Sequence, residues 1–124
     1  MPPSVRYGPR GNGDMAEDWR TPDLETLFSA ILTLETTAET ERFFRDLCTL
    51  NELRDMAQRW AVVRMLDGGM HYAEISRRTG ASTATITRIA SWFNHGEGGY
   101  RAMLEKLAAA SRAGTTPYPI ADER

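Results

Sequence analysis

The sequence predicts an all-α domain, and three observations support this fold class. No proline occurs from Asp23 to Thr116, so nothing forces a break in helices over most of the 124-residue chain. No run of alternating apolar and polar residues is long enough to indicate a sheet. Apolar residues instead recur at steps of three and four, which places them on one face of a helix. The length suits one domain.

Composition excludes several classes of protein. Apolar residues make up 41% of the chain, but their longest runs are far too short to cross a bilayer. A single cysteine, Cys48, excludes an intramolecular disulfide and a cysteine-rich zinc site. His71 and His95 lack the spacing of metal ligands, and no triad or carboxylate pair suggests catalysis. These patterns lead us to expect a protein that is not an enzyme and binds no metal. The N-terminus has no apolar signal segment, so we expect a cytoplasmic protein.

The two ends differ from the rest of the chain. Residues 1–20 are rich in Pro, Gly, Asn and Asp and predict a flexible arm. Alternatively, Met15 is the true start and residues 1–14 do not belong to the native protein. One glycine and two prolines interrupt residues 111–124, which predicts a flexible tail. The helical domain is therefore expected over residues 21–110.

Start and stop signals mark the first three helices. Thr21-Pro22 has the form of an N-cap followed by the first helical residue. Thr36 and Thr49 are each followed three residues later by a glutamate, which predicts a capping box at the start of the second and third helices. Gly68-Gly69 ends the third helix. Its apolar stripe is expected to comprise Leu53, Met56, Ala57, Trp60, Val63 and Leu66.

Residues 71–93 have the pattern of a helix-turn-helix. Two short helices flank Gly80-Ala81-Ser82, where Gly80 suits a left-handed turn and Ser82 can cap the second helix. Ser76 is small, as a close helix crossing requires. The inward positions lie five and one residues before Gly80 and six and nine after it, which is the spacing of this motif. They are Ile75, Thr79, Ile86 and Ile89.

The exposed side of the second helix suits double-stranded DNA. Its threonine hydroxyls can bind phosphate oxygens or base edges, and methyl groups can contact thymine. Arg77 and Arg78 on the preceding helix could bind the DNA backbone. The alternative is a helix pair of a bundle whose polar face is merely rich in threonine. The complete set of predicted DNA-binding residues is Arg77, Arg78, Ser82, Thr83, Ala84, Thr85, Thr87 and Arg88.

The last helix should follow a tight, glycine-rich connection, residues 95–100. Its apolar residues are expected to close the core. They are Tyr100, Met103, Leu104 and Leu107.

Net charge argues only weakly against DNA binding. The chain carries −2 overall, whereas nucleic-acid binders usually carry a basic excess. Residues 54–101, however, hold seven arginines and four carboxylates, a net charge of +3, which leaves −5 for the rest. The predicted DNA-binding half is thus mildly basic between acidic flanks.

The run Gly-Ala-Ser-Thr-Ala-Thr-Ile-Thr-Arg at residues 80–88 resembles the helix-turn-helix of the Trp repressor family. The likeness to its YerC/YecD branch is closer and extends over residues 24–107. It rests on Leu-Asn-Glu-Leu at 50–53, Ala-Gln-Arg-Trp at 57–60 and Gly-Gly-Tyr at 98–100.

The resemblance implies a six-helix, all-α protein that forms an intertwined homodimer and reads a palindromic DNA site as a transcriptional regulator. Apolar residues of the first two helices would form the dimer interface, unless they fill the core of a monomer. The alternative function is a protein-interaction adaptor that keeps the fold without binding DNA. The expected interface residues are Phe28, Ile31, Leu32, Phe43, Phe44 and Leu47.

The resemblance also bears on a corepressor. In the family's tryptophan site two arginines hold the ligand; Arg88 matches one, but Gln58 stands in place of the other. Ile89 and Trp92 replace small residues beside the indole and are expected to fill its space. We therefore expect no cofactor and do not expect L-tryptophan to bind, while a different small effector stays open.

Overall fold

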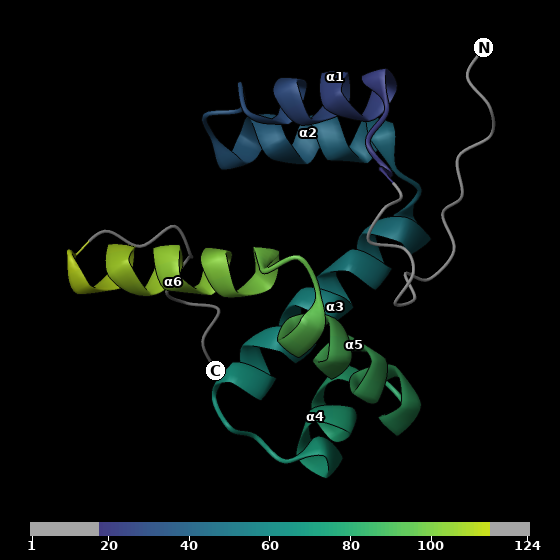
Figure 1. The fold of residues 1–124 in the computed structure, drawn as a ribbon, viewed down its shortest axis with the longest axis vertical. Helices are drawn as coiled ribbons and strands as arrows, with labels where there is room; N and C mark the ends of the chain where they lie inside the picture. Colours follow the sequence, from purple (N-terminus) through teal and green to yellow (C-terminus); the bar gives the residue numbers. More distant parts are fainter. Residues whose placement is uncertain (1–17, 115–124) are drawn as a thin grey trace. The chain divides into compact units, whose positions relative to one another are not determined.

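The computed structural model describes residues 18–114 and forms six helices in that range, with no strand (Figure 1). The all-α prediction is confirmed. None of these helices is long and apolar enough to span a membrane. The helices are α1 (Pro22–Ile31), α2 (Thr37–Leu47), α3 (Leu50–Asp67), α4 (Tyr72–Thr79), α5 (Thr83–His95) and α6 (Gly99–Arg112).

The chain divides into two compact units, one containing α1 and α2 and the other containing α3 to α6. Most of the predicted arm and tail, residues 1–17 and 115–124, lies outside the described residues. Helix α6 continues to Arg112, two residues past the predicted end of the helical domain at residue 110. The helix reaches Arg112 because Gly114, the first residue of this segment that disfavours a helix, lies after that point.

Capping interactions start both helices of the first unit. The Thr21 hydroxyl accepts a hydrogen bond from the backbone N–H of Leu24 at 3.1 Å, and Pro22 is the first helical residue, as predicted. At α2, Thr36 accepts from the N–H of Glu39 at 3.1 Å. The Glu39 carboxylate accepts from the N–H of Glu35 at 2.9 Å rather than from Thr36, so the predicted capping box is only half formed.

Neither α1 nor α2 contains a buried residue. Leu32 is 85% exposed, Leu47 48% and Phe28 43%. Phe43 and Phe44 are half-buried and meet edge to face, with ring centroids 5.6 Å apart. Ile31 is half-buried as well. Among residues 18–114, the six residues expected at a dimer interface therefore form no closed core.

Helix α3 begins with the complete capping box that the sequence predicts. The N–H of Glu52 donates to the Thr49 hydroxyl at 3.1 Å, and the N–H of Thr49 donates to the Glu52 carboxylate at 2.8 Å. The predicted apolar stripe is partly wrong, because Met56 and Ala57 are exposed whereas Val62, absent from the stripe, is fully buried. Val62 and Val63 are both buried since α3 packs against two helices, α4 and α5.

The described residues of the second unit form one apolar core. Helix α6 extends it, because Tyr100 stacks on Trp60 with centroids 6.3 Å apart and Leu104 packs against the buried residues. Met103 is 48% exposed, so the prediction that it closes the core is wrong. It lies about 100° round the helix from Leu104. The core comprises Val62, Val63, Ile75, Ala81, Ile86, Ile89 and Phe93.

Candidate nucleic-acid interface

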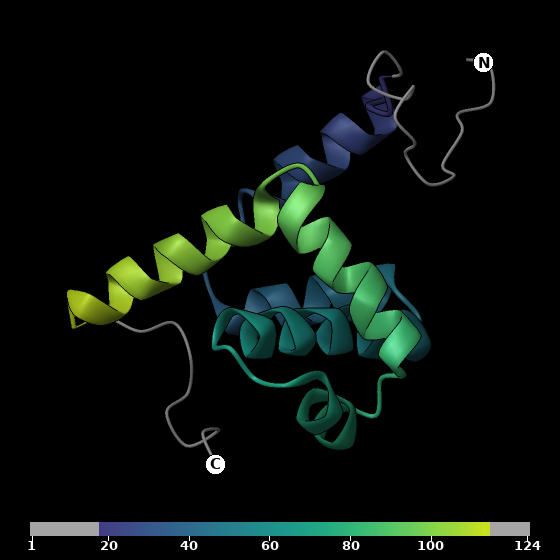
Figure 2. The same ribbon diagram turned by 60° about the horizontal axis from the view of Figure 1, so that its bottom comes forward.

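Helices α4 and α5 are joined by the sharp turn predicted at residues 80–82 (Figure 2). Gly80 is left-handed, with φ of 79° and ψ of 0°, and its N–H donates to the carbonyl of Ser76 at 2.8 Å. Ala81 is buried at 3% exposure, and the inward isoleucines Ile75, Ile86 and Ile89 are at most 1% exposed. The packing that fixes the angle between the two helices is therefore apolar and closed.

Thr79 links the end of α4 to the turn. Its hydroxyl donates to the carbonyl of Ile75 at 2.8 Å and accepts from the N–H of Ala81 at 3.1 Å. The side-chain amide of Gln58, on α3, donates to the Thr79 carbonyl at 3.1 Å. Gln58 thus ties α3 to the turn of the motif. Sequence reasoning missed this role, because nothing in a sequence marks a contact between residues 58 and 79.

Ser82 caps α5 as predicted. Its hydroxyl accepts from the N–H of Thr85 at 3.1 Å, and the first turn of the helix contains no acidic residue. The remaining free N–H groups and the positive end of the helix dipole therefore face solvent without a neutralising carboxylate on that turn. Such a helix start attracts phosphate.

The predicted contact residues of α5 are not equally available. Thr83, Ala84, Thr87 and Arg88 are exposed. Thr85 is half-buried, and its hydroxyl oxygen accepts from Arg88 Nη2 at 3.3 Å and is hydrogen-bonded to the Ser82 hydroxyl at 3.0 Å. The Thr85 hydroxyl is therefore already engaged in hydrogen bonds within α5 that order the start of the helix.

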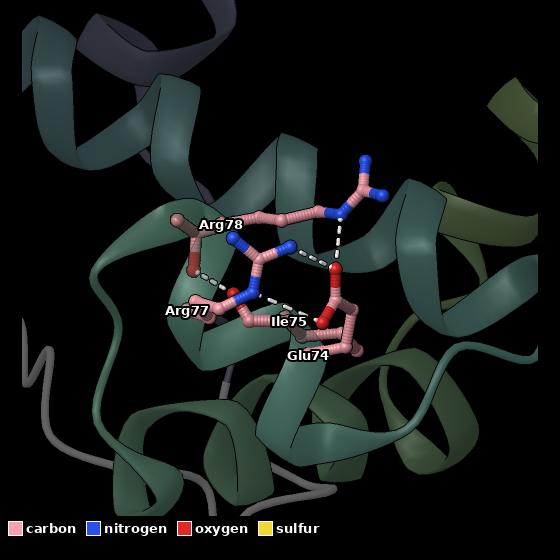
Figure 3. A network of polar contacts seen from close by, with 5 residues as sticks. Glu74, Ile75, Arg77 and Arg78 are labelled. Carbon is pink, nitrogen blue, oxygen red and sulfur yellow. Dashed lines mark hydrogen bonds and ion pairs between the residues drawn. The ribbon is translucent and has the colours of Figure 1, made fainter.

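Arg77 and Arg78 both converge on one carboxylate of α4, that of Glu74 (Figure 3). Arg77 Nε donates to Glu74 Oε1 at 3.1 Å, and Arg77 Nη2 contacts Oε2. Arg78 Nε donates to Oε2 at 2.8 Å. Hydrogen bonds from Arg77, and then from Arg78, lower the pKa of Glu74 from 4.5 to about 2.

Sequence reasoning named the two arginines but not their partner. The signal was present, since Glu74 precedes Arg77 by three residues and Arg78 by four, the spacings that place side chains together on a helix. The candidate interface therefore includes an acidic group that engages both Arg77 and Arg78.

The three residues considered for the tryptophan site lie in different surroundings. Ile89 is 1% exposed within the core between the helices, whereas Trp92 is 49% exposed. That Trp92 fills the space of an indole therefore stays a prediction. Gln58 is engaged with the Thr79 carbonyl. That L-tryptophan does not bind stays a prediction.

The fold and the site define an all-α protein with a helix-turn-helix. The family model described as Trp repressor protein matches residues 22–108, and the chain belongs to the Trp repressor family.

Relatives and solved structures agree with this placement. YerC of Bacillus subtilis (strain 168), an uncharacterised protein, is 46% identical over 88 residues, or 71% of this chain and 85% of YerC. A Trp operon repressor homologue of Chlamydia trachomatis serovar L2 is 31% identical over 66% of this chain and 93% of its own. The crystal structure of a TrpR-like protein from Eubacterium eligens superposes with a TM-score of 0.70 at 43% identity, over 72% of this chain and 92% of that one.

Proposed function

We propose that this protein is a homodimeric, sequence-specific DNA-binding transcriptional regulator. The observation that carries the proposal is the start of α5, where a capped, acid-free helix end presents exposed Thr83, Thr87 and Arg88 on a rigid helix-turn-helix. Membership of a repressor family supports it.

In the proposed complex, α5 enters the major groove with residues 83–88 against base edges and the adjoining phosphates. Threonine hydroxyls and the Arg88 guanidinium supply polar contacts, and the methyl group of Ala84 suits the thymine methyl. Arg77 and Arg78 hold the DNA backbone from α4. Such backbone contacts set position, while contacts of α5 supply sequence preference.

A homodimer fits both the surface and the DNA. The apolar side chains of α1 and α2, with Leu32 85% exposed, would be covered by a second copy. Two recognition helices set about one helical turn of DNA apart would read a palindrome. A single helix-turn-helix of this modest charge would bind only weakly.

Selection of bound duplexes from a random library tests the function. The expected result is an enriched palindrome whose half-sites are centred about 10 base pairs apart. Failure to enrich any sequence, although the protein retains duplex DNA at low salt, would contradict sequence-specific recognition. A single half-site without symmetry would contradict the dimeric arrangement.

The second candidate is an adaptor that uses the fold to bind a protein instead of DNA. The net charge of −2 favours it, because phosphate attraction depends on basic contacts. A mobility shift on genomic fragments separates the two: absence of a shift even at low salt supports the adaptor, and a salt-sensitive shift supports the regulator.

The proposed regulator acts in the cytoplasm, is not an enzyme and does not use L-tryptophan. Ile89 occupies space in the core, and Gln58 replaces one of the two arginines expected to hold the ligand. Calorimetric titration should show no heat of binding with tryptophan at micromolar concentrations. Saturable binding in that range would overturn this part of the proposal.

A further inference from the structure

We propose that Glu74 limits how strongly the protein binds DNA phosphate, by holding Arg77 and Arg78 as an internal competitor of the backbone. This inference rests on the proposed DNA-binding function. It identifies Glu74 as a residue that weakens the binding of DNA. Glu74 acts through the two arginines and needs no contact with DNA itself.

Glu74 occupies the donor atoms of Arg77 that a phosphate would use. Arg77 directs two nitrogens, Nε and Nη2, at the two oxygens of Glu74. Arginine binds a phosphate group with this same pair-wise fork. In Figure 3 the fork of Arg77 is taken up by the carboxylate, whereas Arg78 uses Nε alone and its terminal nitrogens point away. A phosphate bound through the fork of Arg77 must therefore displace Glu74.

The cluster is open to a ligand. The side chains of Arg77 and Arg78 are 68% and 48% exposed, and that of Glu74 is 36% exposed. Exposed ion pairs of this kind are weak enough to be exchanged for a stronger anion. The arrangement thus permits phosphate to replace the carboxylate while opposing it.

The local charge also indicates that Glu74 weakens the binding of phosphate. Two guanidinium groups and one carboxylate leave a local charge of about +1 where the arginines alone would present about +2. The pKa of Glu74, lowered to about 2, keeps the carboxylate ionised at neutral pH. A unit charge about 6 Å from a phosphate in water-like surroundings changes a binding constant about threefold, hence about tenfold for the two copies in a dimer.

The test compares wild-type protein with Glu74→Gln for binding to a random-sequence duplex, by fluorescence anisotropy between about 50 and 200 mM salt. Glu74→Gln should bind more than about tenfold more tightly as a dimer, because release of the arginines adds to the direct charge effect, and its salt dependence should be steeper by about one unit per protomer. Glu105→Gln, on the exposed surface of α6, makes the same change in net charge and is the matched control. It should gain less, because it releases neither Arg77 nor Arg78, whose ion pairs are with Glu74.

A second set of variants shows whether the effect passes through the arginines. In an Arg77→Gln, Arg78→Gln background, adding Glu74→Gln should raise affinity only by the direct charge effect, about tenfold at most for the dimer, and by less than it does when the arginines are present. A gain of unchanged size in that background would show a general charge effect and overturn the competition. Circular dichroism melts of every variant confirm that the helices remain folded.

The possible outcomes distinguish a failure of the inference about Glu74 from a failure of the proposed DNA-binding function. If wild-type protein binds DNA and Glu74→Gln binds equally or more weakly, Glu74 orders the arginines for binding and the inference is wrong. If neither protein binds any duplex at low salt, the DNA-binding function itself fails. If only Glu74→Gln binds, the wild-type protein does not bind DNA, and the proposed function fails together with the inference that rests on it.

Discussion

Arg88 leans back along α5 and donates to the Thr85 hydroxyl, so its guanidinium lies beside the capped start of the helix. A cation at this place adds to the field of the helix dipole where a phosphate would bind. The same group can form two hydrogen bonds to a guanine edge. Arg88 is therefore the residue of α5 with the largest expected effect on DNA binding.

Arg88→Ala should weaken binding to a selected site by about 1–3 kcal/mol per protomer, measured by anisotropy at physiological salt. If Arg88 contacts a base, discrimination at that base pair falls; if it contacts phosphate, all sequences lose affinity alike and the salt slope decreases by about one. Arg112→Ala, which removes an exposed arginine near the end of α6, is the control. If the Arg88 variant binds as tightly as wild-type protein, Arg88 does not contact DNA.

Glu74 gives the protein a defined response to acid. In the folded chain its pKa is about 2, below the ordinary value of 4.5, so between these values the unfolded chain binds more protons. Its stabilising contribution is thus complete above pH 4.5 and is lost as the pH falls toward 2. Urea denaturation from pH 5 to 2 should show a shallower loss of stability for Glu74→Gln than for wild-type protein. Parallel curves would contradict the lowered pKa.

At the scale of elements, the helix-turn-helix depends on a short stretch of backbone. Gly80 adopts a positive φ, Ser82 caps α5, and Gln58 fastens the turn to α3. An added Cβ at Gly80 would meet no atom within 4 Å, so any cost of substitution there comes from backbone conformation and not from a clash.

Gly80→Ala should therefore destabilise the protein by about 1–2 kcal/mol, the cost of placing a side chain in the left-handed region. The fall in Tm should be about 4–8 °C for each kcal/mol in a domain of this size. Gly99→Ala is the matched control, because that position also has open space but lacks a positive φ. Equal melting temperatures for the two variants would contradict this role of Gly80.

At the scale of the whole molecule, the two units differ in how they bury apolar side chains. The unit of α3 to α6 has a closed core of seven residues, whereas α1 and α2 contain no buried residue. A helix pair that leaves Leu32, Leu47 and Phe28 exposed is typical of a surface that a partner covers. This contrast is the physical support for the proposed dimer.

Leu32→Glu should shift the protein toward monomer, as measured by sedimentation equilibrium, because a charge in an apolar interface is costly to desolvate. Thr37→Glu adds the same charge at an exposed polar position of the same unit and should leave the mass unchanged. DNA affinity should fall together with the dimer. A wild-type protein that sediments as a monomer would refute the dimer, and a dimeric Leu32→Glu variant would exclude Leu32 from its interface.

The helical fold, most helix ends and the helix-turn-helix follow from the amino-acid sequence, because these features depend on local rules. Capping threonines, Ser82, a left-handed glycine and helical spacing act within a few residues of one another. The same rules placed Arg88 and the threonines at the start of α5.

Features that depend on packing between residues far apart in the chain required the three-dimensional structure. Val62 is buried and Met56 exposed because α3 meets two helices that periodicity alone does not identify. Gln58 reaches the Thr79 carbonyl across 21 residues. The role of Glu74 lies between these cases: its spacing was visible, but side-chain geometry was needed to show that one carboxylate engages both arginines.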